Sequence, residues 1–257
     1  MLETILLCGF AFLAGFVDSA VGGGGLIQLP ALLAILPGYP FPFLSGTNKL
    51  ASIAGTSVAA YRYARRIKLD WTALLPAAGA AFAASFLGAQ AVSLLNKEVL
   101  RPLIIGLLIV VAIYTFVKKD FGALHAPKLA HRRQVTVGVI AGAGIGFYDG
   151  FFGPGTGSFL ILVFIAGFGF DFLTASASAK VVNFATNLAA IISFLLFGGT
   201  ILYAYALPMA VCNIGGSVLG TRVAMAKGSG FVRVLFLVVV AALIAYLIVN
   251  PTAQPPK

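Results

Sequence analysis

The sequence predicts an all-α polytopic membrane protein made of two homologous repeats, each a broken or re-entrant helical hairpin followed by three transmembrane helices. Its 257 residues are 60% hydrophobic and only 9% charged, whereas a soluble domain carries about 25% charged residues. In addition, a shift of 131 positions carries Asp18 onto Asp149 and Lys49 onto Lys180. Matching copies that each hold a broken segment and a buried charge are typical of secondary transporters.

The duplication covers nearly the whole chain. The later part of each copy aligns with a shift of 132, which carries Leu75-Pro76 onto Leu207-Pro208 and Gly88 onto Gly220. We therefore divide the chain into a first membrane repeat at residues 1–117, a basic cytoplasmic linker at 118–133 and a second membrane repeat at 134–257.

Several apolar stretches approach the ~20 residues that a helix needs to cross the hydrocarbon core. They are Leu44–Tyr63, Trp71–Leu94, Val99–Val117, Thr174–Phe197, Ile201–Thr221 and Phe231–Val249. These stretches supply the three transmembrane helices expected in each repeat.

Two further regions are apolar but interrupted. Residues 3–36 are interrupted at Asp18–Gly25, and residues 134–168 at Asp149–Gly157. Because glycine clusters and Pro154 end helices, each region is left with two legs of about 13–16 residues, short for a full span. Unwound backbone at membrane depth is tolerated only where protein or water satisfies its polar groups.

The lysines and arginines favour an inverted arrangement of the repeats. The net charge is +10, and most basic residues lie in short loops beside apolar spans, where they set orientation rather than bind nucleic acid. If both broken regions re-enter, 12 basic residues share one face, and Lys97, Arg101 and Lys257 lie on the other. If both regions cross, the split falls to 10 against 5. The positive-inside rule thus predicts both termini outside the cytoplasm.

Lys49 and Lys180 are the strongest candidates for a functional role. An ionised lysine at the bilayer centre costs about 2.5–3.5 kcal/mol. Here two lysines occupy matching positions, each 31 residues after a matching aspartate, and intramembrane charges are functional by default. The alternative is structural: the lysines anchor helices at the interface, or form charge pairs, Asp18/Lys49 and Asp149/Lys180, that hold the fold.

The glycine-rich breaks predict an anion site. A helix that begins after a glycine turn offers free backbone N–H groups and the positive end of its dipole. The residues concerned are Gly22, Gly23, Gly24, Gly25, Gly153, Gly155, Thr156 and Gly157. With two lysines they would form a positive pocket for a small oxyanion. Close helix packing is the alternative role for these glycines, and the phosphate-binding P-loop motif is absent from the sequence.

Polar residues near the lysines extend the predicted substrate-binding set. They are Asn48, Ser176, Ser178, Asn183 and Asn187, and the last two share a helix face with Lys180. Hydrogen bonds between helices are the alternative role for these side chains. Asp18 and Asp149 are expected to pair with lysines, to cap the turns or to couple proton movement.

The sequence predicts no catalytic residue, metal site or cofactor. Cys8 and Cys212 do not match under the repeat and form no CxxC motif, while His125 and His131 lie in the central polar loop. An intramembrane enzyme would need a nucleophile with a base, or a metal constellation. The expected partners are therefore a small anionic substrate and the lipid bilayer; a homodimer is compatible with the sequence, but no feature specifies one.

The paired motifs resemble the sulfite exporter TauE/SafE family, also called the toluene sulfonate uptake permease family. The segments that carry the resemblance are GFVDSAVGGGGL at 15–26, SGTNKLASIAGT at 45–56, GFYDGFFGPGTGS at 146–158 and SASAKVVNFATN at 176–187. The resemblance implies a multi-pass permease of the bacterial inner membrane for sulfite, sulfonates or related sulfur-containing anions. The second copy has Ala179 where the first has Asn48, so the two halves of a pocket would differ.

We therefore expect a secondary transporter that moves such an anion by alternating access around a site between the repeats. Lys49 and Lys180 would neutralise the anion, and the backbone of the glycine-rich breaks would hydrogen-bond its oxygens. An anion channel and a structural membrane protein held by charge pairs are the alternatives. The direction of transport, the coupling ion, and whether the broken regions cross or re-enter are not determined by the sequence.

Overall fold

The computed structural model of the chain describes residues 1–94, 130–197 and 201–249, and this part of the chain is helical without strands. The elements are α1 (Leu2–Val21), α2 (Gly25–Ile35), α3 (Phe41–Ala64), α4 (Trp71–Gln90), a 3₁₀ turn (Ala91–Leu94), α6 (His131–Phe151), α7 (Thr156–Val163), a π-helical turn (Phe164–Phe168), α8 (Phe172–Phe197) and α9 (Tyr203–Val249). Within α9, Gly228 has non-helical backbone angles, with φ of 72°, and divides the helix by a kink.

Four described helices are long and apolar enough to cross a bilayer, namely Leu2–Val21, Trp71–Gln90, Phe172–Phe197 and Tyr203–Gly228. Their number agrees with a polytopic membrane protein. The predicted span Leu44–Tyr63 lies within α3, which has 24 residues but lower hydropathy because it carries Lys49 and its polar neighbours. The predicted span Val99–Val117 and linker residues 118–129 lie outside the described residues.

The breaks in the two interrupted regions are shorter than predicted. Asp18 lies inside α1, which continues to Val21, and Asp149 lies inside α6, which continues to Phe151. The first legs are therefore full-length helices of 20 and 21 residues, and only the second legs, α2 and α7, are short. The helices run on to the glycines with positive φ, Gly22 and Gly153, because these turn the chain whereas an aspartate by itself does not end a helix.

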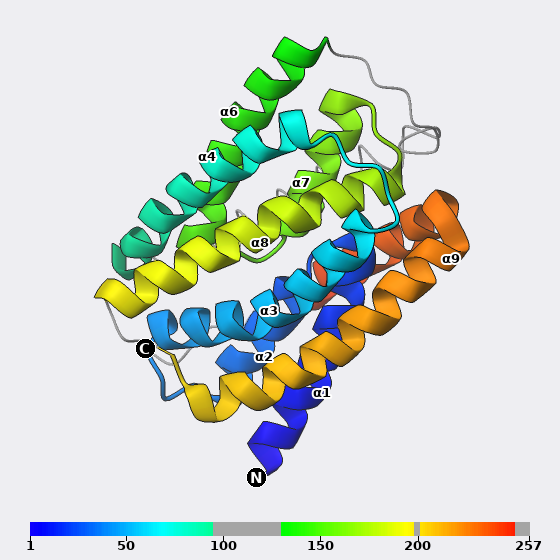
Figure 1. The fold of residues 1–257 in the computed structure, drawn as a ribbon. Coiled ribbons are helices and arrows are strands. Elements are labelled where there is room, and N and C mark those ends of the chain that lie inside the picture. The colour runs from blue at the N-terminus through cyan, green and yellow to red at the C-terminus, as the bar shows by residue number, and fades with distance from the viewer. Residues whose placement is uncertain (95–129, 198–200, 250–257) are drawn as a thin grey trace.

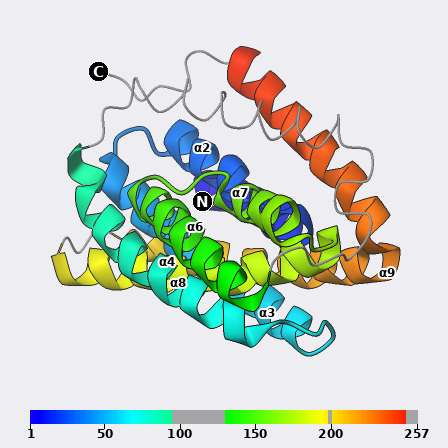
Figure 2. The same ribbon diagram turned by 90° about the horizontal axis from the view of Figure 1, so that it is seen from above.

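The helices form two groups, which can be followed in Figures 1 and 2. In the first helix group α1, α2, α3 and α9 pack together, and in the second helix group α4, α6, α7 and α8 do so. The groups meet mainly where α3 lies along α8. Thus α4, from the first half of the chain, packs among helices of the second half, and α9 does the reverse.

Glycine allows matching helices to touch in both groups. Gly220 of α9 packs directly against the backbone carbonyl of Phe16 in α1, and Gly88 of α4 packs in the same way against the carbonyl of Phe147 in α6. A side chain at either glycine would collide with that backbone. The two contacts are related by the shifts of the sequence repeat, 132 for the glycines and 131 for the phenylalanines. Small residues at such crossings are the usual means by which membrane helices approach closely.

The helix starts that match under the repeat are satisfied in different ways. The Asp70 carboxylate caps α4 by accepting hydrogen bonds from Thr72 N at 3.1 Å and Ala73 N at 3.4 Å. The hydrogen bond from the Thr72 hydroxyl is the largest of the effects that hold the pKa of Asp70 below its ordinary value. At the matching position before α9, the backbone N–H of Leu202 donates to the Thr47 hydroxyl of α3 at 3.0 Å.

Candidate functional site

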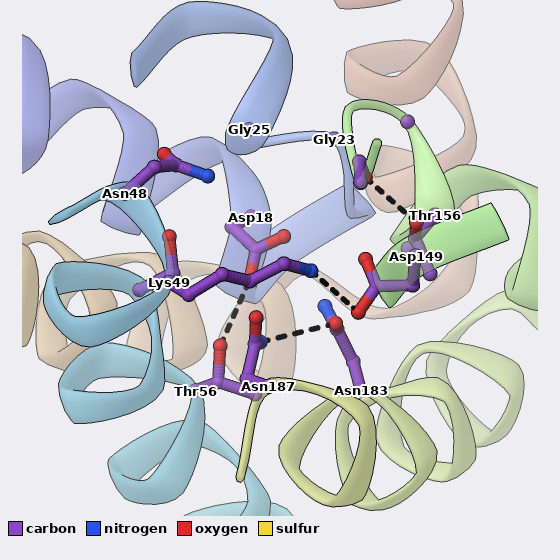
Figure 3. A pocket seen from close by; sticks show the side chains of 14 residues that line it. Asp18, Gly23, Gly25, Asn48, Lys49, Thr56, Asp149, Thr156, Asn183 and Asn187 are labelled. Atoms are coloured by element: carbon purple, nitrogen blue, oxygen red, sulfur yellow. Dashed lines mark hydrogen bonds and ion pairs between the residues drawn. The ribbon is translucent and has the colours of Figure 1, made fainter. Parts of the chain in front are cut away.

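A small polar cavity lies where the two helix groups meet at the breaks (Figure 3). Its volume is about 20 Å³, room for roughly one water molecule. Every wall is polar, charged or glycine. The lining residues are Asp18, Gly23, Gly25, Asn48, Lys49, Ser52, Thr56, Asp149, Gly153, Gly155, Thr156, Gly157, Asn183 and Asn187.

Lys49 crosses the cavity from α3 to reach Asp149 on α6. Its Nζ lies 2.7 Å from Asp149 Oδ2, and both side chains are only 2% exposed. Figure 3 shows the lysine lying along the cavity with its amine directed at that carboxylate. Among the described residues the carboxylate has no further hydrogen-bond donor, so Lys49 is its only partner there.

Lys180 reaches from α8 to Asp18 on α1, and this pair is held by more contacts. The Nζ–Oδ2 distance is 2.8 Å, with Lys180 fully buried and Asp18 16% exposed. Gly24 N donates to Asp18 Oδ1 at 3.3 Å, and the Thr56 hydroxyl donates to Oδ2 at 3.5 Å. Lys180 is not among the residues that line the cavity, although its partner Asp18 is.

The expected pairing of charges within each repeat is wrong. The alternative charge pairs Asp18/Lys49 and Asp149/Lys180 are replaced by pairs that cross between the halves, Lys49–Asp149 and Lys180–Asp18. Each pair also joins the two helix groups, since α1 and α3 belong to the first group and α6 and α8 to the second. Removing one partner from a buried pair is costly because it leaves an uncompensated charge, so these pairs bind the groups to each other.

The breaks present two helix N-termini to the cavity. Gly25 begins α2 and Thr156 begins α7, and both residues line the wall. Gly22, with φ of 77°, lets the two breaks touch: a Cβ added there would lie 2.5 Å from the carbonyl carbon of Gly157. The N–H groups of Leu26, Ile27 and Thr156 already donate to the carbonyls of Gly23, Gly24 and Gly153, so what the helix starts contribute is the positive end of the helix dipole. This part of the wall therefore favours negative charge.

Amide and hydroxyl groups complete the wall opposite the breaks. Asn187 Nδ2 donates to Asn183 Oδ1 at 3.2 Å on α8, as Figure 3 shows. Sequence reasoning missed Ser52 and Thr56 of α3, which also line the cavity. The signal was present, because the shift of 131 carries these two residues onto Asn183 and Asn187.

Gln28 is a further residue that the sequence did not single out. It is fully buried in α2 and donates through Nε2 to Asn48 Oδ1 at 3.0 Å, while its Oε1 accepts from Asn213 of α9 at 2.9 Å. Gln28 thus holds Asn48 at the edge of the cavity. Under the repeat its position matches Phe159, so the repeat gives no hint of this role.

The remaining predicted site residues lie beside the cavity rather than in its wall. Ser176 donates to the carbonyl of Ala20 at 3.3 Å, and Ser178 is buried in α8. Gly22 and Gly24 shape the first break, where Gly22 packs on the second break and Gly24 binds Asp18.

The two cysteines, which do not match in sequence, meet in space. Cys8 of α1 and Cys212 of α9 are free thiols, both partly exposed, and they lie close enough to interact with each other. In the described part of the chain, groups of three or more His, Cys, Asp and Glu that could hold a metal ion are absent.

Comparisons with known proteins find membrane transporters. The model of the family described as "Sulfite exporter TauE/SafE" matches residues 7–247. A "Probable membrane transporter protein ORF9" of Sinorhizobium is 38% identical over 94% of this chain and 91% of its own length. "Probable membrane transporter protein YfcA" of Escherichia coli K12 is 33% identical, over 95% and 89% respectively. A "Probable membrane transporter protein" of Haemophilus influenzae is 35% identical, over 90% and 89%. No solved structure matches the chain.

Proposed function

Because this chain belongs to the sulfite exporter TauE/SafE family of membrane transporters, we propose that it carries small sulfur-containing anions, such as sulfite or organosulfonates, by alternating access. The family and the relatives are membrane transporters rather than enzymes. The observation that carries the proposal is the polar cavity at the meeting of the two breaks, where Lys49 and the starts of α2 and α7 converge. The protein would act as a multi-pass protein of the bacterial inner membrane.

The chemistry of the wall suits an oxyanion. Lys49 supplies a positive charge, and the starts of α2 and α7 supply the positive ends of two helix dipoles. Asn183 and Asn187 add amide N–H donors. Such a wall can bind the three oxygens of a sulfite or sulfonate group from several directions. It does not select for the rest of the substrate molecule.

The arrangement of helices favours a moving carrier. A cavity of about 20 Å³ is too small for a sulfonate group, so substrate entry requires the two helix groups to separate on one side. Both ion pairs cross between these groups, and an anion that competes with Asp149 for Lys49 would loosen that contact. The matched contacts at Gly88 and Gly220 favour two inverted repeats that exchange α4 and α9.

Ligand-dependent thermal unfolding of the purified protein tests the proposal. The panel holds methanesulfonate, sulfoacetate and sulfite, with sulfate, phosphate and acetate for comparison. An anion at 100 times its Kd adds about 2.7 kcal/mol to stability, so stabilisation by a sulfur anion is expected. Lys49→Met is expected to abolish stabilisation by the anion. The matched Lys180→Met is expected to be less stable without ligand but still stabilised by the anion, because of the two lysines only Lys49 lines the cavity.

The outcomes separate the alternatives. Absence of stabilisation by all three sulfur anions, or stabilisation that persists in Lys49→Met, would contradict the proposed site. An anion channel would be favoured if reconstituted protein passed the anion without accelerating counterflow of a labelled copy. A structural membrane protein would show neither binding nor flux.

A further inference from the structure

The cavity proposed for an anion already contains two carboxylates. The charged groups that line it are Lys49, Asp149 and Asp18, and Lys180 stands behind Asp18 at 2.8 Å. Two lysines and two aspartates sum to no net charge. An incoming anion therefore meets a site that is neutral as a whole, and it has to displace a carboxylate from Lys49.

A bound anion would leave this buried site with an uncompensated negative charge. Burying an isolated charge is strongly unfavourable at membrane depth, and like charges a few ångströms apart repel strongly in such surroundings. The charge can be balanced if one carboxylate takes up a proton as the anion enters. The geometry distinguishes the two candidates for that proton.

Asp18 is the poorer candidate. It accepts from Lys180 Nζ, from Gly24 N and from the Thr56 hydroxyl, and none of these contacts is lost when Lys49 changes partner. The hydrogen bonds that it accepts stabilise the ionised form. Asp18 and Lys180 therefore remain partners when Lys49 moves.

Asp149 is the better candidate, because Lys49 is its only described cationic or hydrogen-bonding partner. The helices α4 and α7, which pack against α6, contain no charged residue, and α8 contributes only Lys180, which Asp18 occupies. The neighbouring Tyr148 donates its hydroxyl to Pro154 O at 2.7 Å, away from the carboxylate. An Asp149 carboxylate that loses Lys49 would thus be buried, 2% exposed, with nothing to balance its charge.

We propose that the anion is transported together with one proton, which Asp149 takes up as Lys49 turns from the Asp149 carboxylate to the anion. The inference rests on the proposed function and deepens it, since it assigns the proton as the coupling ion and one residue as its carrier. The reverse exchange on the other side of the membrane releases both: the anion leaves, Asp149 loses its proton, and Lys49 returns to the carboxylate.

The pH dependence of anion affinity tests the proposal. The probes are methanesulfonate and sulfoacetate, whose charges are constant near neutral pH. If binding takes up one proton, the affinity of the wild-type protein rises about tenfold for each unit by which the pH falls. Asp149→Asn is expected to remove this slope, because the amide is neutral at every pH. The matched Asp18→Asn variant is expected to retain it.

Calorimetry of the wild-type protein supplies a second measurement that needs no variant. When anion binding is measured in buffers of different ionisation enthalpy, the apparent heats give the number of protons taken up, and a value near one is expected.

The two proposals fail in different ways. If a sulfur anion binds but its affinity does not change with pH, and calorimetry counts no proton, the coupling role of Asp149 is overturned and the transport function stands. A slope that survives in Asp149→Asn and disappears in Asp18→Asn would transfer the role to Asp18. If none of the sulfur anions binds the wild-type protein, the proposed function fails first.

Discussion

Two ion pairs built from matching residues of the two halves have different surroundings. Lys49 lies along the cavity and offers its amine to an Asp149 for which the described residues provide no other donor, whereas Lys180 is outside the cavity and Asp18 has two additional donors. Positions that match under the shift of 131 thus form one pair in the cavity wall and one pair that is held by further hydrogen bonds. The comparison teaches that the repeat supplies positions, while the divergence of neighbouring side chains decides what each position can do.

Part of that divergence is visible beside each lysine. Asn48 precedes Lys49 and is held at the cavity by Gln28, whereas Ala179 precedes Lys180. Ser52 and Thr56 of α3 face Asn183 and Asn187 of α8 across the same cavity. Only Thr56 among these four reaches a carboxylate, that of Asp18, which contributes to the difference between the pairs.

Exchanging the charges within one ion pair is expected to give the largest effect on stability. Lys49→Asp is expected to destabilise the protein by about 3–5 kcal/mol, because it removes the partner of buried Asp149 and adds a second carboxylate. Adding Asp149→Lys should restore much of the loss, whereas adding Asp18→Lys should not. Thermal unfolding in detergent measures all three. Recovery with Asp18→Lys instead would mean that charges pair within each half.

Two crosslinks, one between α1 and α9 and one between the matching helices α6 and α4, test whether the two halves are structurally equivalent. Cys8 and Cys212 lie close enough to interact, so a mild oxidant should join them and raise stability by about 2–4 kcal/mol. The repeat shifts carry these positions onto Val139 and Ala80. Val139→Cys with Ala80→Cys, made in a chain without the native cysteines, should form the same crosslink.

Mass spectrometry under non-reducing conditions identifies each crosslink, and unfolding with and without reductant gives its effect. A crosslink in the first helix group alone would show that α4 and α6 do not repeat the register of α9 and α1.

Paired glycine substitutions compare the two helix contacts directly. Gly220→Val and Gly88→Val each place a side chain against backbone, at Phe16 and Phe147 respectively, and each is expected to destabilise by about 1–3 kcal/mol. Gly79→Ala in α4 is the control, because a Cβ there meets nothing within 4 Å. If thermal unfolding shows that the two valine substitutions reduce stability by different amounts, the halves are equivalent in sequence but not in helix packing.

The smallest expected effect concerns the matching helix starts. Asp70→Ala should lose about 1 kcal/mol of stability at neutral pH. The pKa of Asp70 is lowered in the folded protein, so this contribution is present above the ordinary pKa of Asp and disappears as the pH falls through the folded value. Wild type and Asp70→Ala should therefore converge in acid.

Thr47→Val removes the acceptor for Leu202 N at the other helix start, and a loss of similar size but without pH dependence is expected, because a hydroxyl does not titrate in this range. Unfolding midpoints across an acidic pH series check both variants. A Thr47→Val deficit that vanished in acid would contradict this assignment.

The sequence by itself determined the class of the protein and the positions of its charges. Few charged residues, long apolar stretches and a shift of 131 that repeats Asp18 and Lys49 are local properties of the chain, readable because hydropathy and composition act residue by residue. The short helices after each break were also predictable, since a cluster of glycines at 22–25 and Pro154 between two glycines favour a turn of the chain.

Only the tertiary structure decided which charges meet. Asp18 and Lys180 are 162 positions apart, and their contact depends on α1 and α8 belonging to different helix groups that come together at the breaks. The same packing brings the carboxylate of Asp18, near the end of α1, to a lysine from another helix. It also placed Lys49, and not Lys180, in the cavity wall. Which charges pair, and which lysine lines the cavity, depend on how the helices pack, whereas the repeat can be seen in the sequence alone.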